Sequence, residues 1–154
     1  MTGRIDARLA ELGITLPAAP APAANYVPYV RTGSLVFVSG QISQGPDGPI
    51  RGCLGQDLDV AAGAAAARSC GLAIIAQLRT ACDGDLDRVI RAVKLTGFVN
   101  STAGFTDQPK VVNGCSDLMV EVFGEAGRHA RAAVSAPSLP LGVAVEVDAV
   151  FEVR

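Results

Sequence analysis

The segment of residues 143–153 alternates strictly between two kinds of side chain, and this alternation constrains the fold more than any other feature of the chain. An extended strand turns successive side chains to opposite faces of a sheet. One face would carry Val145, Val147, Ala149, Phe151 and Val153, and the other Glu146, Asp148, Val150 and Glu152. The first face must be buried. The second face, on which Glu146 and Asp148 would lie roughly 6.6 Å apart, must lie away from the helices and meet either water or another subunit.

Two helical patterns precede this strand. Residues 57–81 are rich in alanine, begin at Asp57 or Asp59, and end at the turn sequence CDGD. Their small side chains would allow close approach to a sheet. A second helical pattern lies within residues 106–127, where Gly124 and Gly127 mark a fraying end.

Further strands and an amino-terminal arm complete the pattern. Apolar residues predict a hairpin in residues 29–43, with Val36 and Val38 on one face and Leu35 and Phe37 on the other. Further strands are expected within residues 85–100 and at residues 131–135. Residues 3–13 predict a short amphipathic helix, and the prolines that follow favour an extended connector.

The order of these elements indicates an α+β fold, a mixed sheet with both main helices on one face. We expect a single domain over residues 1–154, in which residues 1–24 form the amino-terminal helix and a Pro/Ala-rich arm.

The charge content limits the partners. Charged residues make up 18% of the chain, against about 25% in a typical globular protein, so some apolar surface is expected to be buried between subunits. The formal net charge is −2 and no block of lysines and arginines occurs. Because binding to a phosphate backbone needs such a block, we expect no nucleic-acid partner.

The cysteines and the amino-terminal sequence favour the cytoplasm. The four cysteines form no CxxC pair and the chain has one histidine, so the usual spacing of a zinc site is missing and we expect reduced, structural thiols and no metal. The amino end has acids and no apolar core of a signal peptide. The most apolar window contains Arg68 and is rich in alanine, which fits a packed helix better than a membrane span.

Arg131 stands at the head of an apolar strand and is the first candidate for chemistry. Its strand pattern groups it with Ala133 and Ser135 on a polar face, backed by Ala132 and Val134. A guanidinium offers five fixed donors that match a planar carboxylate. The pattern alone leaves three interpretations open: a structural ion pair with Glu146, an exposed edge charge, or a ligand-binding arginine.

Three other polar residues have simple structural interpretations. Ser39 could cap a turn, Tyr26 could pack with its hydroxyl group in water, and His129 could interact with a helix end. Because no serine or cysteine beside the single histidine suggests a nucleophile and its base, a triad hydrolase is not expected.

Three motifs together resemble the RidA (YjgF-type) family, over most of the chain from about residue 25 to residue 153. HARAAVSAPSLPLGVAVEVDAVFEV is similar to the family's closing segment, in which an arginine strand, a Leu-Pro loop and an acid-bearing strand follow one another. LVFVSGQIS is similar to its Ser-Gly-Gln strand, and NYVPYV to its upstream tyrosine.

The resemblance implies a chorismate-mutase-like α+β subunit in a homotrimer, with clefts between neighbouring subunits. It implies hydrolysis of reactive enamines and imines to 2-keto acids and ammonia, as in 2-iminobutanoate/2-iminopropanoate deaminases, without metal or cofactor. Arg131 would bind the substrate carboxylate and Glu146 would position or activate water. Ser39 and Tyr26 would line the cleft, and Asn113 matches a helix asparagine of the family. An iminium carbon is already electrophilic, so orientation and a proton acceptor suffice.

The chain also departs from the family pattern. Ala133 stands where many members have a cysteine, His129 replaces a proline, and the amino-terminal arm is longer. These departures place the chain nearer a divergent branch, sometimes labelled endoribonuclease-like. The alternative function is a non-catalytic module that binds a small carboxylate or keto acid in the same cleft. RNA cleavage, a third hypothesis, is disfavoured by the acidic balance and the single histidine.

Overall fold

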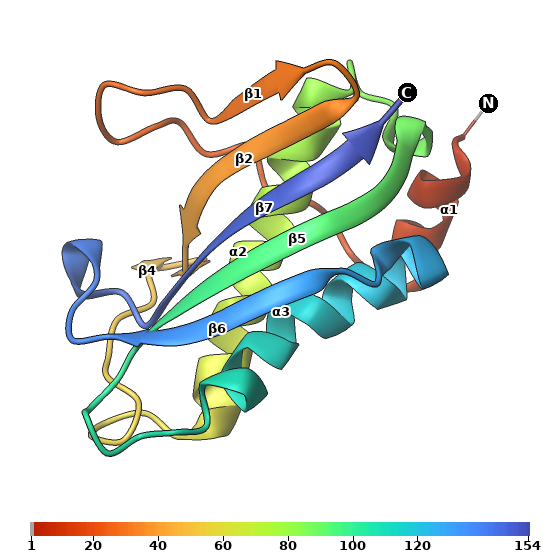
Figure 1. Cartoon of the computed structure of the whole chain (residues 1–154). Coiled ribbons are helices and arrows are strands. Elements are labelled where there is room, and N and C mark those ends of the chain that lie inside the picture. Colours follow the sequence, from red (N-terminus) through yellow and green to blue (C-terminus); the bar gives the residue numbers. More distant parts are fainter. Residues whose placement is uncertain (1) are drawn as a thin grey trace.

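A computed structural model describes residues 2–154, which form a five-stranded mixed sheet with helices packed on one face (Figure 1). The sheet has the strand order β1-β2-β7-β5-β6, and only the β5–β6 pair is parallel. Its strands are β1 (Tyr29–Thr32), β2 (Leu35–Ile42), β5 (Val89–Asn100), β6 (Ala130–Ala136) and β7 (Val145–Val153), and a separate small ribbon pairs β3 (Gln44–Gly45) with β4 (Gly48–Pro49).

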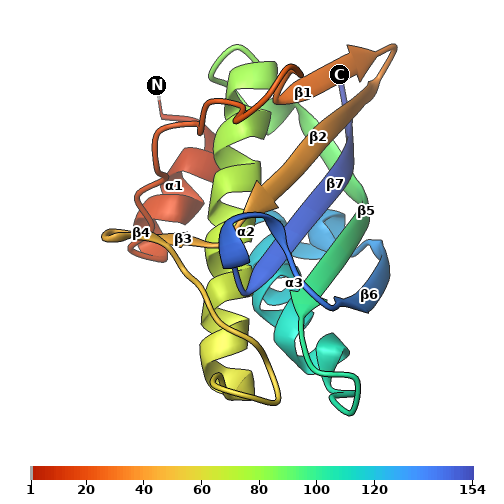
Figure 2. The same cartoon turned by 90° about the vertical axis from the view of Figure 1, so that its left-hand side faces the viewer.

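The helices are α1 (Arg4–Glu11), α2 (Val60–Ala81) and α3 (Gln108–Phe123), with short 3₁₀ turns at Leu86–Arg88, Gly124–Gly127 and Pro140–Gly142. Figure 2 shows α2 and α3 together on one side of the sheet. Asp59 caps α2 by accepting a hydrogen bond from the Ala62 amide at 2.8 Å, whereas Asp57 accepts from the Cys53 amide. The predicted α+β class, with both main helices on one face, is confirmed.

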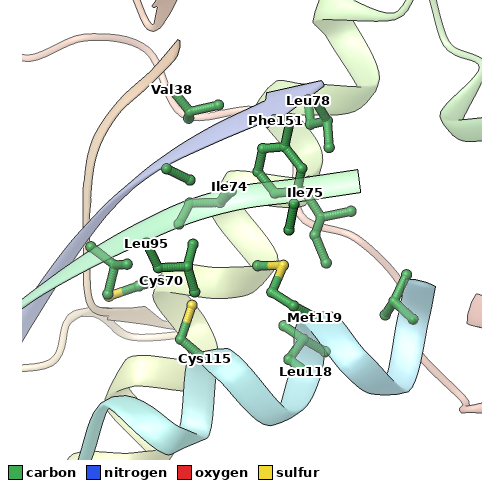
Figure 3. Packing of buried hydrophobic residues seen from close by; sticks show 14 of the residues in the cluster. Val38, Cys70, Ile74, Ile75, Leu78, Leu95, Cys115, Leu118, Met119 and Phe151 are labelled. Atoms are coloured by element: carbon green, nitrogen blue, oxygen red, sulfur yellow. The ribbon is translucent and has the colours of Figure 1, made fainter. Parts of the chain in front are cut away.

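The core lies between the sheet and the two long helices. Figure 3 shows Ile74 and Leu78 of α2 and Met119 of α3 directed toward Phe151 of β7. The small residues of these helices also let them approach each other closely, because a Cβ on Gly114 of α3 would collide with the backbone of α2. Along β7 burial alternates residue by residue, as the sequence predicts.

The central helix α2 is long and apolar enough to cross a membrane by length and composition alone. However, 56% of its most apolar window is buried inside the fold, which is what the core helix of a globular protein shows. We therefore interpret α2 as a core helix.

The amino-terminal helix and the arm are attached to the domain at several points. The Asp87 carboxylate accepts hydrogen bonds from the amides of Arg4 at 2.7 Å and Ile5 at 2.8 Å, and Ile5 is buried. Further along, the buried Gln77 of α2 donates a 2.6 Å hydrogen bond to the Pro20 carbonyl. The arm is thus held against α2.

The other face of the sheet is not covered by helices, and it is partly apolar. The strand register places Val30, Phe37 and Val134 on this open face together with Glu146 and Asp148. Val30 is 53% exposed and Phe37 is 45% exposed. Such a surface on a sheet is typical of an interaction face.

Candidate functional site

Arg131 lies on β6 beside Leu95, so its side chain points to the helix-covered face and lies against α3. This corrects the sequence-based assignment of faces: Val134 is on the open face and 44% exposed, whereas Ala133 packs against the core. The side chains of β6 still alternate between the two faces of the sheet. β6 is an edge strand, and there α3 presents polar groups to the inner face.

Neutral acceptors hold the Arg131 guanidinium. Nη1 donates to Asn113 Oδ1 at 2.8 Å and to Ser116 Oγ at 3.2 Å, and Nη2 donates to the Pro109 carbonyl at 3.4 Å. None of the ion pairs found within residues 2–154 includes Arg131. Of its five N–H groups, one on Nε and one on Nη2 remain, which is the number that a bidentate carboxylate takes.

The single histidine contacts a serine, contrary to the sequence-based expectation. His129 Nε2 lies 2.9 Å from Ser116 Oγ, and Nδ1 lies 2.6 Å from the Gly127 carbonyl oxygen. Sequence reasoning missed Ser116, although it lies three residues after Asn113 and so shares its helix face. It also missed the contact because His129 and Ser116 are on separate elements, and only the fold brings these together.

Glu146 is half-buried on the open face of β7, close to a β-bulge in β2. Ser39 and Gly40 together stand opposite one residue of β7, Asp148. The Glu146 carboxylate lies directly over Gly40, where a Cβ would come within 3.1 Å of the Glu146 Cδ atom. Gly40 therefore leaves the space that the carboxylate occupies.

A pocket of about 270 Å³ opens beside Glu146. Its walls come from the arm, from β2 and from the loop before β7, and they include Pro20–Ala23, Tyr26, Gly40, Gln41 and Leu141. Tyr26, a predicted lining residue, thus shares the pocket with Glu146. Ser39 does not line it: its hydroxyl group donates to the Val27 carbonyl at 2.7 Å, which matches the turn-capping interpretation.

Two acids of the open face, Glu146 and Asp148, have raised pKa values. Burial, followed by the neighbouring charge of Asp148, raises the pKa of Glu146. Burial also raises the pKa of Asp148, while Thr96 and Lys94 oppose that shift. A carboxylate with a raised pKa holds a proton more tightly, which suits a group that accepts one from water.

Arg131 and Glu146 do not meet within one chain. Glu146 aligns with Phe98 and Val134 on the open face, whereas Arg131 aligns with Leu95 on the helix-covered face. Arg131 lies two strands across from Glu146 and three residues along the strand direction, so the Cα atoms of the two residues are roughly 14 Å apart. Their side chains lie on opposite faces of the sheet. The structure therefore excludes the intrachain ion pair between Arg131 and Glu146 that the sequence left open.

Three of the four cysteines are buried in the core. All four are free, and Cys70, Cys82 and Cys115 are buried. Burial raises the pKa of Cys115 to about 12, so this thiol stays protonated. Within residues 2–154, no group of three or more His, Cys, Asp or Glu side chains is arranged to hold a metal ion.

Comparison with known proteins identifies relatives over nearly the whole chain. A family described as "YjgF/chorismate mutase-like, putative endoribonuclease" matches residues 6–152. Protein TCP17 of Trypanosoma cruzi is 54% identical over 158 residues, which cover 99% of this chain and 96% of the relative. The crystal structure of Atu1372 from Agrobacterium tumefaciens, a protein of unknown function, is 46% identical, with a TM-score of 0.89 over 97% of this chain and 94% of that one.

A more distant solved structure extends the comparison. E. coli TdcF, crystallised with bound serine, is 27% identical, with a TM-score of 0.62 over 88% of this chain and 93% of that one. The resemblance to the RidA (YjgF-type) family is confirmed, and this chain belongs to the YjgF/chorismate mutase-like family.

Proposed function

We propose that this protein hydrolyses reactive enamine and imine intermediates such as 2-aminoacrylate to 2-keto acids and ammonia. Arg131, held by Asn113, binds the substrate carboxylate, and Glu146 positions and activates the attacking water. Tyr26 lines the pocket, and Ser39 supports its wall through the turn at Val27. The proposed reaction needs no cofactor.

One observation carries this proposal: Arg131 is held by neutral acceptors and keeps unsatisfied donors. A guanidinium paired with an acid of its own chain would have little affinity left for a ligand. Here Asn113, Ser116 and Pro109 orient the group without neutralising its charge. An anion with two parallel oxygens, such as a substrate carboxylate, fits the remaining donors.

The proposed site lies between subunits of a homotrimer. Because Arg131 and Glu146 lie on opposite faces of their own sheet, one substrate can reach both only if a neighbouring subunit supplies one of them. The partly apolar open face, with Phe37 and Val134, is the surface that we propose to be buried by this assembly.

The reaction is balanced by one water molecule. Water oxygen attacks the iminium carbon while Glu146 takes a proton from that water. Glu146 then returns its proton to the amine of the carbinolamine. The C–N bond breaks as the carbonyl forms, and the departing ammonia takes up the hydroxyl proton and leaves as ammonium. The burial that raises the pKa of Glu146 makes it a better proton acceptor in this sequence.

The serine bound to E. coli TdcF supports the choice of substrate. Serine carries a carboxylate beside an amine-bearing carbon, the same two features as a 2-imino acid. A protein of the same family therefore holds a small molecule of the chemical class proposed here.

The test generates 2-aminoacrylate with a pyridoxal-phosphate serine dehydratase and follows keto-acid formation with and without this protein. We expect acceleration by the wild type, and its loss in Arg131→Ala and Glu146→Gln. Arg4→Ala, which removes an exposed arginine of α1, is the matched control. No acceleration by the wild type, or full acceleration by Arg131→Ala, contradicts the proposal.

Three further measurements test the alternative functions and the assembly. Saturable binding of pyruvate that depends on Arg131 but brings no hydrolysis would favour a non-catalytic binding module. Cleavage of a single-stranded RNA would favour the activity in the family's description. Sedimentation tests the homotrimer. A cytoplasmic location is part of the proposal, because free thiols persist in a reducing compartment.

A further inference from the structure

We propose that Ser116 and His129 are positioning residues that keep Arg131 ready for a substrate carboxylate. This inference rests on the proposed function, since it concerns the same guanidinium. It starts from a side-chain cluster that neither the family resemblance nor the reaction accounts for.

The hydrogen bonds of this cluster run in one direction. A backbone carbonyl can only accept, so the 2.6 Å contact with Gly127 requires the hydrogen of the neutral His129 ring to be on Nδ1. Nε2 then has a free lone pair and accepts the hydroxyl hydrogen of Ser116 at 2.9 Å. Ser116 Oγ in turn presents its lone pairs to Arg131 Nη1, 3.2 Å away.

This direction determines what Arg131 encounters. A serine hydroxyl group without a fixed acceptor can rotate and turn its hydrogen toward the guanidinium. Because His129 takes that hydrogen, Ser116 remains an acceptor. Together with Asn113, it saturates Nη1 and fixes the plane of the guanidinium. The N–H group of Nε and the second N–H group of Nη2 are thereby left for the ligand.

The surrounding charges agree with this role. Ser116, His129 and Arg131 line a shallow groove of about 270 Å³, together with Asp117, Val120 and Arg128. Arg128 forms an ion pair with Glu125 at 3.1 Å. Asp117 is exposed on α3 and makes no ion pair within the part of the chain that the structure describes. Arg131 is therefore the oriented cation at this edge of the sheet.

The test uses the imine assay and measures KM and kcat separately. We expect Ser116→Ala and His129→Ala to raise KM by about tenfold, the effect of weakening one charge-assisted hydrogen bond. The value of kcat should change less than about twofold, because Glu146 and its water are untouched. His129→Gln should restore KM to near the wild-type value, since its amide oxygen can accept the Ser116 hydrogen.

Controls and contrary outcomes distinguish this inference from the proposed function. Ser34→Ala, in the turn between β1 and β2, is the matched serine control, and urea unfolding checks that each variant is folded. Wild-type activity with unchanged KM in both variants overturns the inference alone. A large fall in kcat for Ser116→Ala also overturns it, because Ser116 would then take part in the chemistry. A wild type without hydrolysis or keto-acid binding removes the proposed function and this inference with it.

Discussion

The substitution Gly40→Ala tests the position of the Glu146 carboxylate with one methyl group. The new Cβ would lie 3.1 Å from Cδ and 3.3 Å from Cγ of Glu146, and still closer to Oε1. Carbon atoms pack at about 3.5–4.0 Å, so the carboxylate must move by roughly 0.5–1 Å. A misplacement of about 1 Å in a reacting group costs up to roughly 100-fold in rate, so we expect imine hydrolysis to fall 10- to 100-fold.

The same substitution should hardly change stability. Gly40 has no positive φ, so alanine fits its backbone conformation. Glu146 would leave its preferred rotamer at a cost of about 0.5–1.5 kcal/mol. Restricting the unfolded chain offsets about 0.4–1 kcal/mol of this. The free energy of unfolding should therefore change by less than about 1 kcal/mol.

The assay pairs initial rates with urea unfolding of the same preparations. Gly104→Ala is the control, because its Cβ meets no atom within 4 Å and its φ is not positive. Loss of activity at unchanged stability, in Gly40→Ala only, is the expected result. If Gly40→Ala keeps the wild-type rate, the observed position of Glu146 is not the one that activates water, and the reasoning is refuted.

Three more perturbations follow from the geometry. Asp148→Asn removes the charge that helps to raise the pKa of Glu146. The acid limb of the pH–rate profile should therefore move to lower pH. Native carboxyls with raised pKa values release protons less readily than unfolded ones, so the native state loses stability as the pH rises. In Asp148→Asn, the loss of stability between about pH 4 and pH 7 should become smaller in urea titrations. Phe151→Ala empties a fully buried position, so the free energy of unfolding should fall by about 3–5 kcal/mol in urea titrations; a loss below about 1 kcal/mol would contradict the core packing. Gln77→Leu removes the 2.6 Å hydrogen bond to the Pro20 carbonyl, which should destabilise the protein by about 1–3 kcal/mol. Proteolysis within residues 17–28 should become faster. Unchanged cleavage would show that other contacts hold the arm.

The fold class could be predicted from the sequence because it depends on local periodicity. Strict alternation in β7 identified both its buried face and the face with the acids, and the burial of the strand follows it residue by residue. The sequence offered Asp57 or Asp59 for the start of α2 and Gly124 and Gly127 for the end of α3, and the structure has Asp59 and Gly124 as the cap residues. Such caps act on backbone groups within one turn of the helix. These features need no knowledge of distant neighbours.

The sequence failed at the edge strand β6. Arg131 alternates with its neighbours as predicted, yet alternation cannot say which face of a strand is covered. The answer depends on where α3 lies, and α3 offers Asn113 and Ser116 to the arginine on the inner face. The contact of His129 with Ser116 was missed for the same reason.

The sequence by itself determined the order of the main strands and helices and the buried face of β7. It also determined the family of the chain, and with it Arg131 and Glu146 as candidate site residues. Only the tertiary structure decided that these two residues lie on opposite faces, that Gly40 makes room for the carboxylate, and that neutral groups hold the guanidinium. The physical reason is range: backbone preferences and side-chain periods act over a few residues, whereas hydrogen bonds and steric contacts between separate elements exist only once the chain has folded.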